Sequence, residues 1–291
     1  MKDELGDRMK KQYESRTRYS LPRRTYTIIR LDGKAFHTFT RGMNRPYDEN
    51  LMKIMDETAK YLCENIQGSR FAYTQSDEIS ILLTDFDKIT TDAWYDGNIQ
   101  KIVSVAASIA TAKFNELMLI ETFKKIDEYY DWQDTCFSGL VDIITKQNKL
   151  ANFDARVFTI PDPIEVENYF IWRQKDAVRN SISMVAQSLY SHKELEGKTS
   201  SDKQDLIHEK GQNWNDMPEG FKRGRFVNYV YLFDLETSIE FQKCSPEGMT
   251  EEAAKRINEA CSRGEWEIKP AADFLKDRDA LRDIIPKITS E

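Results

Sequence analysis

Short hydrophobic runs along the chain predict β-strands. Residues 27–34 read Thr-Ile-Ile-Arg-Leu-Asp-Gly-Lys, residues 71–83 form a longer run, and residues 153–161 end at Pro161. These runs are rich in β-branched and aromatic side chains, which strands favour, and proline can end a strand because it has no N–H to donate. A further strand is predicted at residues 225–234.

Between the strands, apolar residues recur at helical spacing. The clearest case is residues 48–68, which begin at a residue able to cap a helix, Asp48. Its apolar face comprises Leu51, Met55, Ala59, Leu62 and Ile66. Further helices are predicted at about residues 98–123, 166–190 and 250–262, whereas the polar, glycine-containing residues 191–220 predict a mobile loop.

The order of these elements is strand, helix, strand with hairpin potential, helix, strand. This order predicts an α+β protein built on a ferredoxin-like βαββαβ layer with helices on one face, the layout of polymerase palms and nucleotide cyclases. We expect a catalytic unit over residues 1–190 that includes a basic N-terminal arm. Residues 191–291 add the loop, additional strands and a charged helical tail packed on the same unit.

Composition narrows the class of protein. A chain of 291 residues can bury a large core without disulfides, and its four cysteines are scattered, with no C-x-x-C pair. The N-terminus begins with charged residues and the apolar stretches look too short to cross a bilayer. We therefore expect a soluble, cytoplasmic protein with reduced thiols and no membrane partner.

The net charge of −7 argues against indiscriminate coating of nucleic acid, but the charge is unevenly distributed. Residues 8–24 contain a single acid, Glu14, among many cations. The segment is either a solvated helix end or a phosphate-binding arm. Its basic residues are Arg8, Lys10, Lys11, Arg16, Arg18, Arg23 and Arg24.

Two acids stand out as candidate metal ligands. Asp32 ends the first strand and Asp77 lies within the second run. Each alone is weak evidence, but two carboxylates on neighbouring strands can bridge Mg²⁺ ions whose other positions are filled by substrate phosphates. The carbonyl of Gly33 can complete a metal shell, and Lys34 and Arg30 are close enough in sequence to neutralise phosphate charge. P-loop, Rossmann and zinc-protease motifs are absent from the sequence, so a nucleotide would be held by metal and side chains.

Two further blocks combine aromatic and basic residues. In residues 169–181, either Arg173, Arg179 and Asn180 recognise a nucleotide or RNA end, or the block is a packed helix with an intrahelical Asp176–Arg179 pair. Residues 208–225 suit single-stranded RNA or a tRNA arm, although such a stretch is usually only a loop.

Five ordered motifs resemble the tRNA-His guanylyltransferase superfamily, the polymerases that add nucleotides in the 3′ to 5′ direction. They lie at residues 7–10, 30–37, 45–48, 73–78 and 172–176, and the similarity continues through residues 221–224 to Pro270, Phe274 and Asp279. The resemblance implies a palm-like domain whose substrates are tRNA, ATP and GTP, with two Mg²⁺ ions, assembled as a homotetramer. It implies metal ligation by Asp32, Gly33 and Asp77, and catalytic roles for Asp32, Asp77 and Glu78.

The resemblance also suggests which residues bind each substrate. Nucleotide binding is implied for Asp32, Gly33, Lys34, Ala35, Phe36, His37, Arg45, Ser76 and Asp77. The RNA 5′ end, or its activation, is assigned to Arg30, Arg173, Lys175, Asp176, Arg179 and Asn180.

In this family the tRNA 5′-monophosphate is first adenylylated with ATP, and the 3′-hydroxyl of an incoming nucleotide then attacks it; a 5′-triphosphate tRNA enters at the second step. The chain carries Val178-Arg179-Asn180-Ser181 where eukaryotic members have His-x-Asn-Asn. This change resembles the bacterial, archaeal and phage "like" proteins, which repair 5′-truncated tRNAs by templated addition. The alternatives are a palm-type nucleotide cyclase without an RNA substrate and a non-catalytic RNA-binding module.

Overall fold

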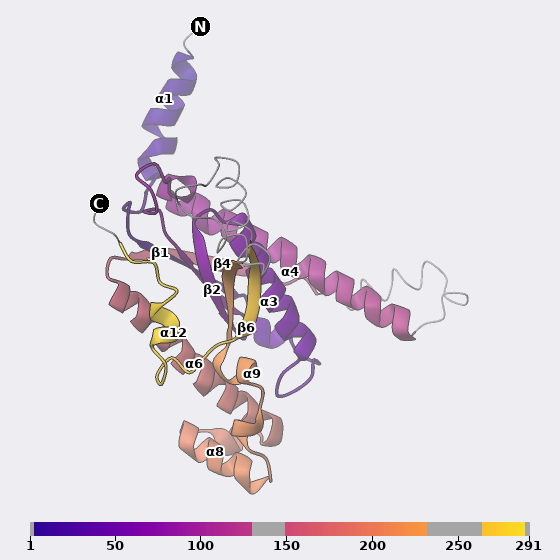
Figure 1. The fold of residues 1–291 in the computed structure, drawn as a ribbon. Coiled ribbons are helices and arrows are strands. Elements are labelled where there is room, and N and C mark those ends of the chain that lie inside the picture. Colours follow the sequence, from indigo (N-terminus) through magenta and orange to yellow (C-terminus); the bar gives the residue numbers. More distant parts are fainter. Residues whose placement is uncertain (1–2, 130–148, 232–263, 289–291) are drawn as a thin grey trace, which may run out of the picture.

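A six-stranded antiparallel sheet forms the centre of the computed structural model, which describes residues 3–129, 149–231 and 264–288 (Figure 1). The strand order is β4-β1-β3-β2-β5-β6. The strands are β1 (Tyr26–Gly33), β2 (Ser69–Gln75), β3 (Glu78–Leu83), β4 (Phe153–Ile160), β5 (Arg225–Tyr231) and β6 (Gly264–Pro270).

The first four strands confirm the predicted ferredoxin-like layer. They alternate with α3 (Glu49–Asn65) and α4 (Ile99–Tyr129), and their spatial order β4-β1-β3-β2 is that of the βαββαβ motif. The predicted second strand is a hairpin, because Ser76 and Asp77 turn the chain between β2 and β3. Asp48 caps α3 as predicted, accepting hydrogen bonds from the backbone N–H groups of Asn50 (3.0 Å) and Leu51 (3.1 Å).

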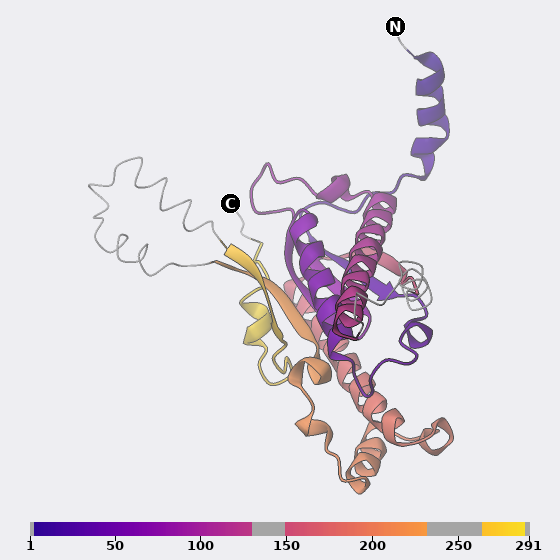
Figure 2. The same ribbon diagram turned by 90° about the vertical axis from the view of Figure 1, so that its right-hand side faces the viewer.

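Alternate residues of the strands serve two different cores. Ile29 and Leu31 of β1 point into the core beneath α3 and α4, whereas Tyr26 and Ile28 point into the core beneath α6 (Pro163–Leu189). The two views of the ribbon show α3 and α4 together over one face of the sheet (Figure 2). The second core includes Phe170 from α6, so the sheet is covered on both faces. The helices of the βαββαβ unit lie on one face, and α6 adds a third layer.

Residues 191–220 are helical, so the predicted loop is wrong. They form α7 (His192–Leu195), α8 (Ser200–Glu209), η3 (Trp214–Asp216) and the start of α9 (Glu219–Arg223). Ser191 and Thr199 begin α7 and α8 with capping boxes, which satisfy free backbone N–H groups at the helix starts. The segment packs against the end of α6 in a small core that includes Ile182, Val185, Ala186, Leu195, Ile207 and Trp214.

The C-terminal part of the chain completes the sheet. β5 pairs with β2, and β6, one of the additional strands expected in residues 191–291 without stated bounds, pairs with β5 along its whole length. A one-turn helix, α12 (Asp279–Arg282), buries Leu281 in the core beneath α6. The predicted helix at residues 250–262 lies outside the described residues.

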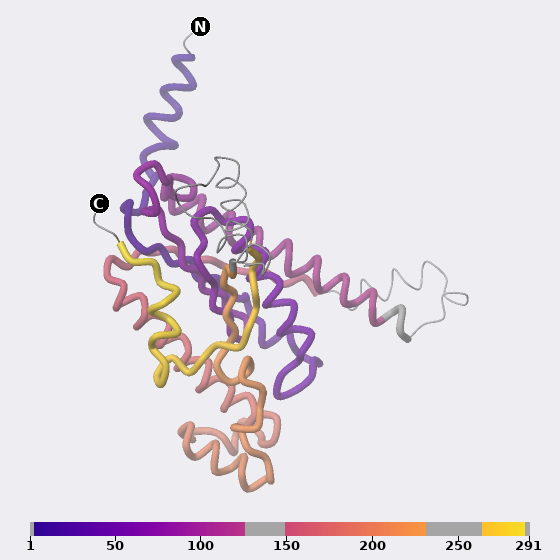
Figure 3. Tube along the Cα trace, viewed as in Figure 1, coloured from indigo at the N-terminus to yellow at the C-terminus, as the bar shows by residue number. Residues whose placement is uncertain are grey.

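The N-terminal arm divides into two parts. α1 (Glu4–Gln12) and η1 (Glu14–Thr17) bury no residues, and α1 stands clear of the body (Figure 3). Arg23 and Arg24 instead bind the acidic segment before η2 (Trp94–Gly97): Arg23 Nε lies 2.8 Å from Asp85 Oδ2, and Arg24 Nη2 donates to the Ile89 carbonyl at 2.9 Å. These two cations of the predicted phosphate-binding arm are therefore occupied in holding the loop.

Helix α4 contradicts the expectation that every apolar stretch is too short to cross a membrane. Its residues Ile99–Lys125 are long and apolar enough by length and composition alone. Part of this helix belongs to the core, because Ile102, Ala106, Ala110 and Phe114 pack beneath the sheet with α3.

Candidate active site at the end of the central strands

The chain brings Asp32 and Asp77 to the same end of the sheet. Asp32 of β1 lies directly opposite Glu78 of β3, and Asp77 is in the turn just before Glu78. The N–H of Gly33 donates to the carbonyl of Asp77 at 3.1 Å, which ties the end of β1 to this turn. Burial raises the pKa of Asp77, Ser76 lowers it by donating a hydrogen bond at 3.0 Å, and the charge of Asp32 raises it again, with a net increase. The strand register and the backbone hydrogen bond therefore bring the two acids to one end of the sheet.

Strained backbone flanks both acids. Ser76 has φ of 49° and Ala35 has φ of 55°, in the left-handed region that costs a residue with a side chain about 1–2 kcal/mol. Ala35 starts α2 (Phe36–Phe39), whose first ring folds back over Gly33. A Cβ at position 33 would overlap that ring, so the turn needs glycine for close approach.

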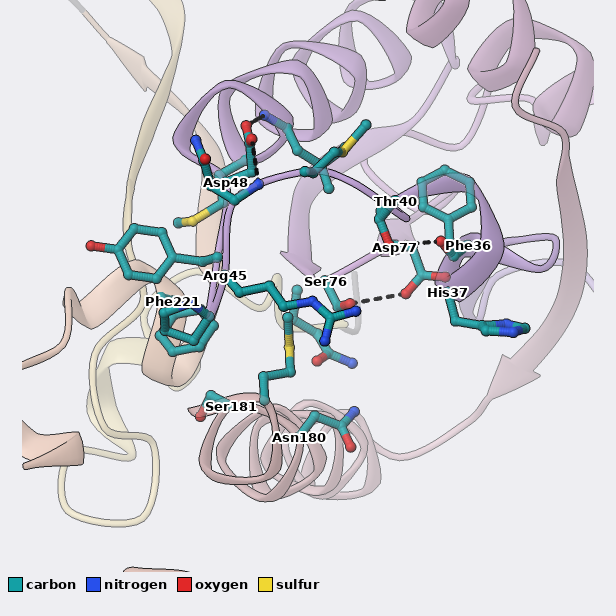
Figure 4. Close-up of a pocket in the computed structure, with 18 of the residues that line it drawn as sticks. Phe36, His37, Thr40, Arg45, Asp48, Ser76, Asp77, Asn180, Ser181 and Phe221 are labelled. Carbon is teal, nitrogen blue, oxygen red and sulfur yellow. Dashed lines mark hydrogen bonds between the residues drawn. The ribbon is translucent and has the colours of Figure 1, made fainter. Parts of the chain in front are cut away.

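A cavity of about 400 Å³ opens beside Asp77. One wall is polar and includes Ser76 and Asp77, and the guanidinium of Arg45 reaches across towards them from the opposite wall (Figure 4). Another wall contains the rings of Tyr47 and Phe221, whose centroids are 4.9 Å apart. The remaining lining residues are Phe36, His37, Thr40, Met43, Asn44, Pro46, Asp48, Leu51, Met52, Gln75, Ala177, Asn180, Ser181, Met184, Gln187 and Arg225. A cavity with aromatic and polar walls of this size suits a small organic ligand that carries an anionic group.

A buried ion-pair network supports the acids from the α6 side. Arg173 donates to both carboxylate oxygens of Glu78, at 2.7 and 2.6 Å, and to Asp176 at 2.9 Å. The side chains of Arg173 and Glu78 are only 7% and 9% exposed. Burial lowers the pKa of Arg173, but Glu78 and Asp176 more than offset this, so its pKa is raised and the guanidinium stays charged. Asp176 also accepts a hydrogen bond from Arg179 at 2.6 Å, which confirms the predicted intrahelical pair.

A second buried pair lies under the cavity. Arg225 Nε is 2.6 Å from Asp56 Oδ1 of α3, and Nη1 donates to the carbonyl of Gly220 at 3.2 Å. Burial raises the pKa of Asp56, although the charge of Arg225 opposes the increase. This pair joins β5 to α3, so the cavity has a fixed floor.

The donor atoms of the site fit magnesium. No group of three or more His, Cys, Asp or Glu side chains that could hold a metal occurs among the described residues. Asp32, Asp77 and the Gly33 carbonyl would provide a purely oxygen-based set, which Mg²⁺ prefers, and substrate phosphates commonly fill its remaining positions. The site therefore suits an ion that is shared with a phosphate-bearing substrate.

Comparisons with known proteins agree with this architecture. The model of the family described as tRNAHis guanylyltransferase matches residues 6–161, more than half of the chain. The chain belongs to the tRNAHis guanylyltransferase family. The tRNA(His) guanylyltransferase of Kluyveromyces lactis is 30% identical over 218 residues, covering 70% of this chain and 82% of that protein. The family assignment makes the chain a nucleotidyltransferase.

Solved structures extend the similarity beyond the matched residues. A bacterial tRNA(HIS) guanylyltransferase-like protein in complex with ATP is 40% identical, with a TM-score of 0.72, and covers 97% of this chain and 99% of that one. A structure of such a protein in complex with GTP is 37% identical over the same shares, with a TM-score of 0.70. The likeness to this family therefore includes α6 and the C-terminal strands.

The structure separates the predicted site residues into three groups, and Asp32 and Gly33 end β1 outside the cavity lining. Phe36, His37, Arg45, Ser76, Asp77 and Asn180 line the cavity. Glu78, Arg173 and Asp176 form the network on the α6 side, and the charge of Arg30 acts on Glu78 there. Lys34, Ala35, Lys175 and Arg179 are exposed outside the cavity lining, with the Lys34 N–H bound to the Asn152 carbonyl. The burial of Arg173 does not fit its predicted contact with RNA.

Several residues that line the guanylyltransferase-family cavity were missed. Tyr47 and Asp48 belong to the Arg45-Pro46-Tyr47-Asp48 motif, which could have identified them. Phe221 and Arg225 belong to the block at residues 208–225 that was predicted to suit RNA, but their approach to Tyr47 and Asp56 depends on the pairing of β5 with β2. The sequence carries no local signal for that pairing.

Proposed function

We propose that the chain adds nucleotides in the 3′ to 5′ direction to the 5′ end of tRNA. The observation that carries this proposal is that Asp32 and Asp77 lie at the same end of the sheet and that Asp77 lines a nucleotide-sized cavity. The names of the relatives and the ATP- and GTP-bound solved structures support tRNA, ATP and GTP as the substrates.

The chemistry consists of two in-line displacements at phosphorus. An oxygen of the RNA 5′-phosphate forms a bond to the α-phosphorus of ATP and pyrophosphate leaves, which gives an adenylylated end. The 3′-hydroxyl of the incoming nucleotide then bonds to the RNA 5′-phosphorus, its proton passes to solvent and AMP leaves. When bound at Asp32, Asp77 and Gly33, two Mg²⁺ ions would neutralise phosphate charge and lower the pKa of the attacking hydroxyl.

The protein's own groups then position the reactants. Arg45 extends into the cavity opposite Asp77 and would contact the triphosphate (Figure 4). Tyr47 and Phe221 provide aromatic surface for the nucleobase. Both oxygens of Glu78 are held by Arg173, so we assign Glu78 to positioning β3 beside Asp32 rather than to contact with the reacting atoms.

We further propose that templated repair of 5′-truncated tRNA is the main activity. The support is the Val178-Arg179-Asn180-Ser181 sequence, which replaces the eukaryotic His-x-Asn-Asn motif. Asn180 and Ser181 both line the cavity, so the replaced motif lies where it can influence how the nucleotide is selected.

The test is a single-turnover assay with 5′-truncated tRNA, ATP, GTP and Mg²⁺. We expect extension that follows the complementary strand of the acceptor stem, and a tRNA with a changed template base should change the nucleotide added. Chromatography of the products should show no cyclic nucleotide. Absence of any extension would overturn the proposed function, and extension independent of the template base would overturn repair alone.

Binding of Mg²⁺ is expected to weaken as the pH falls. The weakening should begin at a pH above about 4, the pKa of an ordinary aspartate. The reason is that the raised pKa of Asp77 makes protons compete with the metal at a higher pH than usual. Calorimetric titration of Mg²⁺ at several pH values measures this effect. Asp87→Asn, at an exposed loop acid, should keep the wild-type profile, and a flat profile for the wild type contradicts the prediction.

We propose a homotetramer, supported by the apolar end of α4, where Ile120 and Phe123 are 44% and 42% exposed. Replacing both by glutamate is expected to reduce the molar mass measured by light scattering, because charges oppose burial in an interface. Ile89→Glu, at an 89% exposed loop position, serves as the control. An unchanged mass for the α4 variant would contradict a role for this surface.

A further inference from the structure

Trp172 is an exposed aromatic residue on the N-terminal half of α6. Its side chain is 48% exposed, whereas Phe170 and Ile171 beside it are buried. A single exposed apolar residue is ordinary on a protein surface. The position of Trp172 is distinctive because of how its ring is held and what surrounds it.

The indole ring is held by the buried network of the active site. The guanidinium carbon of Arg173 lies 4.4 Å from the ring centroid, and Tyr169 contacts the ring at 5.9 Å between centroids. Arg173 cannot swing away, because it is bound to Glu78 and Asp176. One face of the indole is thus covered by a fixed cation, which leaves the opposite face and outer edge for a ligand.

The ring is connected through Arg173 and Glu78 to the strand end that carries Asp32, a candidate metal ligand. Glu78, which holds Arg173, is directly opposite Asp32 in the register of β1 and β3. Trp172 does not line the nucleotide cavity, whereas Asn180 of the same helix does. Eight residues of helix place these two positions about 12 Å apart along the axis. The reacting phosphates can therefore lie between a base in the cavity and a second base at Trp172.

Several basic residues lie on the α6 face of the sheet, near Asp32 and Glu78. Arg30 is opposite Arg156 in the register of β1 and β4, so both side chains point to the α6 face, and the charge of Arg30 acts on Glu78 and Tyr169. Arg156 and Arg179 are 55% and 61% exposed at their side chains, although each also lies near an acid, Asp154 at 3.9 Å and Asp176 at 2.6 Å, and Lys175 is exposed on α6. In a protein with a net charge of −7, this local concentration suits a phosphate backbone.

We propose that Trp172 is the platform on which the terminal base at the open 5′ end of the RNA substrate stacks. The inference rests on the proposed function, since it assumes that RNA is the second substrate. An aromatic ring with one free face stacks on any base, while the surrounding Arg and Lys side chains meet the phosphates. Stacking fixes the 5′-phosphate relative to Asp32 without reading the base sequence, as repair of different tRNAs requires.

The experiment compares Trp172→Ala with Trp172→Phe, with Ile164→Ala as a matched control at another exposed apolar position of α6. The substrate is 5′-truncated tRNA whose terminal base is 2-aminopurine, a base that loses fluorescence when it stacks. We expect wild type, Trp172→Phe and Ile164→Ala to quench the fluorescence on binding, and Trp172→Ala not to. The KM for RNA should increase about 10-fold or more in Trp172→Ala, with the KM for the nucleotide changed less than about twofold.

The outcomes separate this inference from the proposed function. Suppose that the wild type adds nucleotides and that Trp172→Ala binds RNA and quenches the 2-aminopurine fluorescence as the wild type does. The stacking proposal is then wrong, whereas the proposed activity stands. This result is expected if the exposed ring instead contacts a protein partner. If Trp172→Phe behaves as Trp172→Ala, or both KM values rise together, stacking is also overturned. If the wild type quenches but adds no nucleotide, the proposed function fails and the platform stands. Thermal unfolding of each variant confirms that it is folded.

Discussion

Asp77→Asn is expected to abolish nucleotide addition while leaving the fold intact. The substitution removes a carboxylate that would ligate the metal beside the substrate phosphates. The single-turnover rate should therefore fall at least about 1,000-fold, equivalent to about 4 kcal/mol of transition-state stabilisation. Stability should not fall, because burial already raises the pKa of Asp77 and so favours an uncharged group at this position. The loss should therefore appear in the rate constant at saturating RNA and nucleotide, with an unchanged or slightly higher Tm.

The sheet offers a close control. Asp154 of β4 is opposite Asp32 in the register of β1 and β4, but its side chain is 58% exposed and outside the cavity. Asp154→Asn should change the rate less than about threefold, since an exposed charge is well screened. If Asp77→Asn kept more than a tenth of the wild-type rate, the metal-ligand assignment would be wrong. If both variants lost activity equally, the loss would come from the removal of any negative charge at this end of the sheet, and it would not identify Asp77 as a metal ligand.

The ferredoxin-like layer could be predicted because its signals are local. Each of its strands is a short run with β-branched residues, and the capped, periodic pattern that starts at Asp48 identifies α3. The placement of the acids followed from the same signals, since Asp32 ends a strand and Asp77 lies in a polar step between two apolar runs.

Elements stabilised by distant contacts were missed. In residues 191–220 the apolar positions Leu195, Ile207 and Trp214 are too widely spaced to show a helical period, and they become a core only against α6. The segment Gly264–Pro270 alternates charged and apolar residues, which is a local strand signal that was overlooked, and it pairs with β5 along its whole length. For residues 191–220, by contrast, tertiary packing determines the structure.

The pairing of Glu78 with Arg173 is likewise a contact between distant parts of the chain, which the sequence does not reveal. They are 95 residues apart, and each was predicted to have a chemical role because no local pattern shows that they bind each other. In the structure the two side chains are only 9% and 7% exposed, and both carboxylate oxygens of Glu78 accept hydrogen bonds from Arg173. The pair instead connects α6 to the strand that faces Asp32.

Arg173→Met is therefore expected to destabilise the protein by about 3–5 kcal/mol, the range observed when one partner of a buried ion pair is removed. The methionine preserves apolar volume but leaves the carboxylate of Glu78 buried without its charge partner. The double variant Glu78→Gln/Arg173→Met should recover most of the loss, because it removes the unpaired charge. Urea unfolding of both single variants, the double variant and the wild type completes the cycle.

Arg179→Met serves as the matched control, since Arg179 is on the same helix and binds Asp176, but its side chain is 61% exposed. Its loss should cost less than about 1 kcal/mol, because exposed pairs contribute little. Equal destabilisation by Arg173→Met and by the double variant would contradict the argument, since the cost would then come from lost packing around Trp172.

The pH dependence of Arg173→Met provides a separate test of the same cause. Burial raises the pKa of Glu78, and in the wild type the charge of Arg173 opposes this increase. Without Arg173 the pKa of Glu78 should rise further above its unfolded value, so the folded state binds a proton more tightly than the unfolded state. Relative to the wild type, the variant should then be destabilised least below the unfolded pKa of glutamate, near about 4, and increasingly as the pH rises through the higher folded pKa of Glu78. Replacing Glu78 by glutamine in this background should remove this loss, because no titrating group remains at that position.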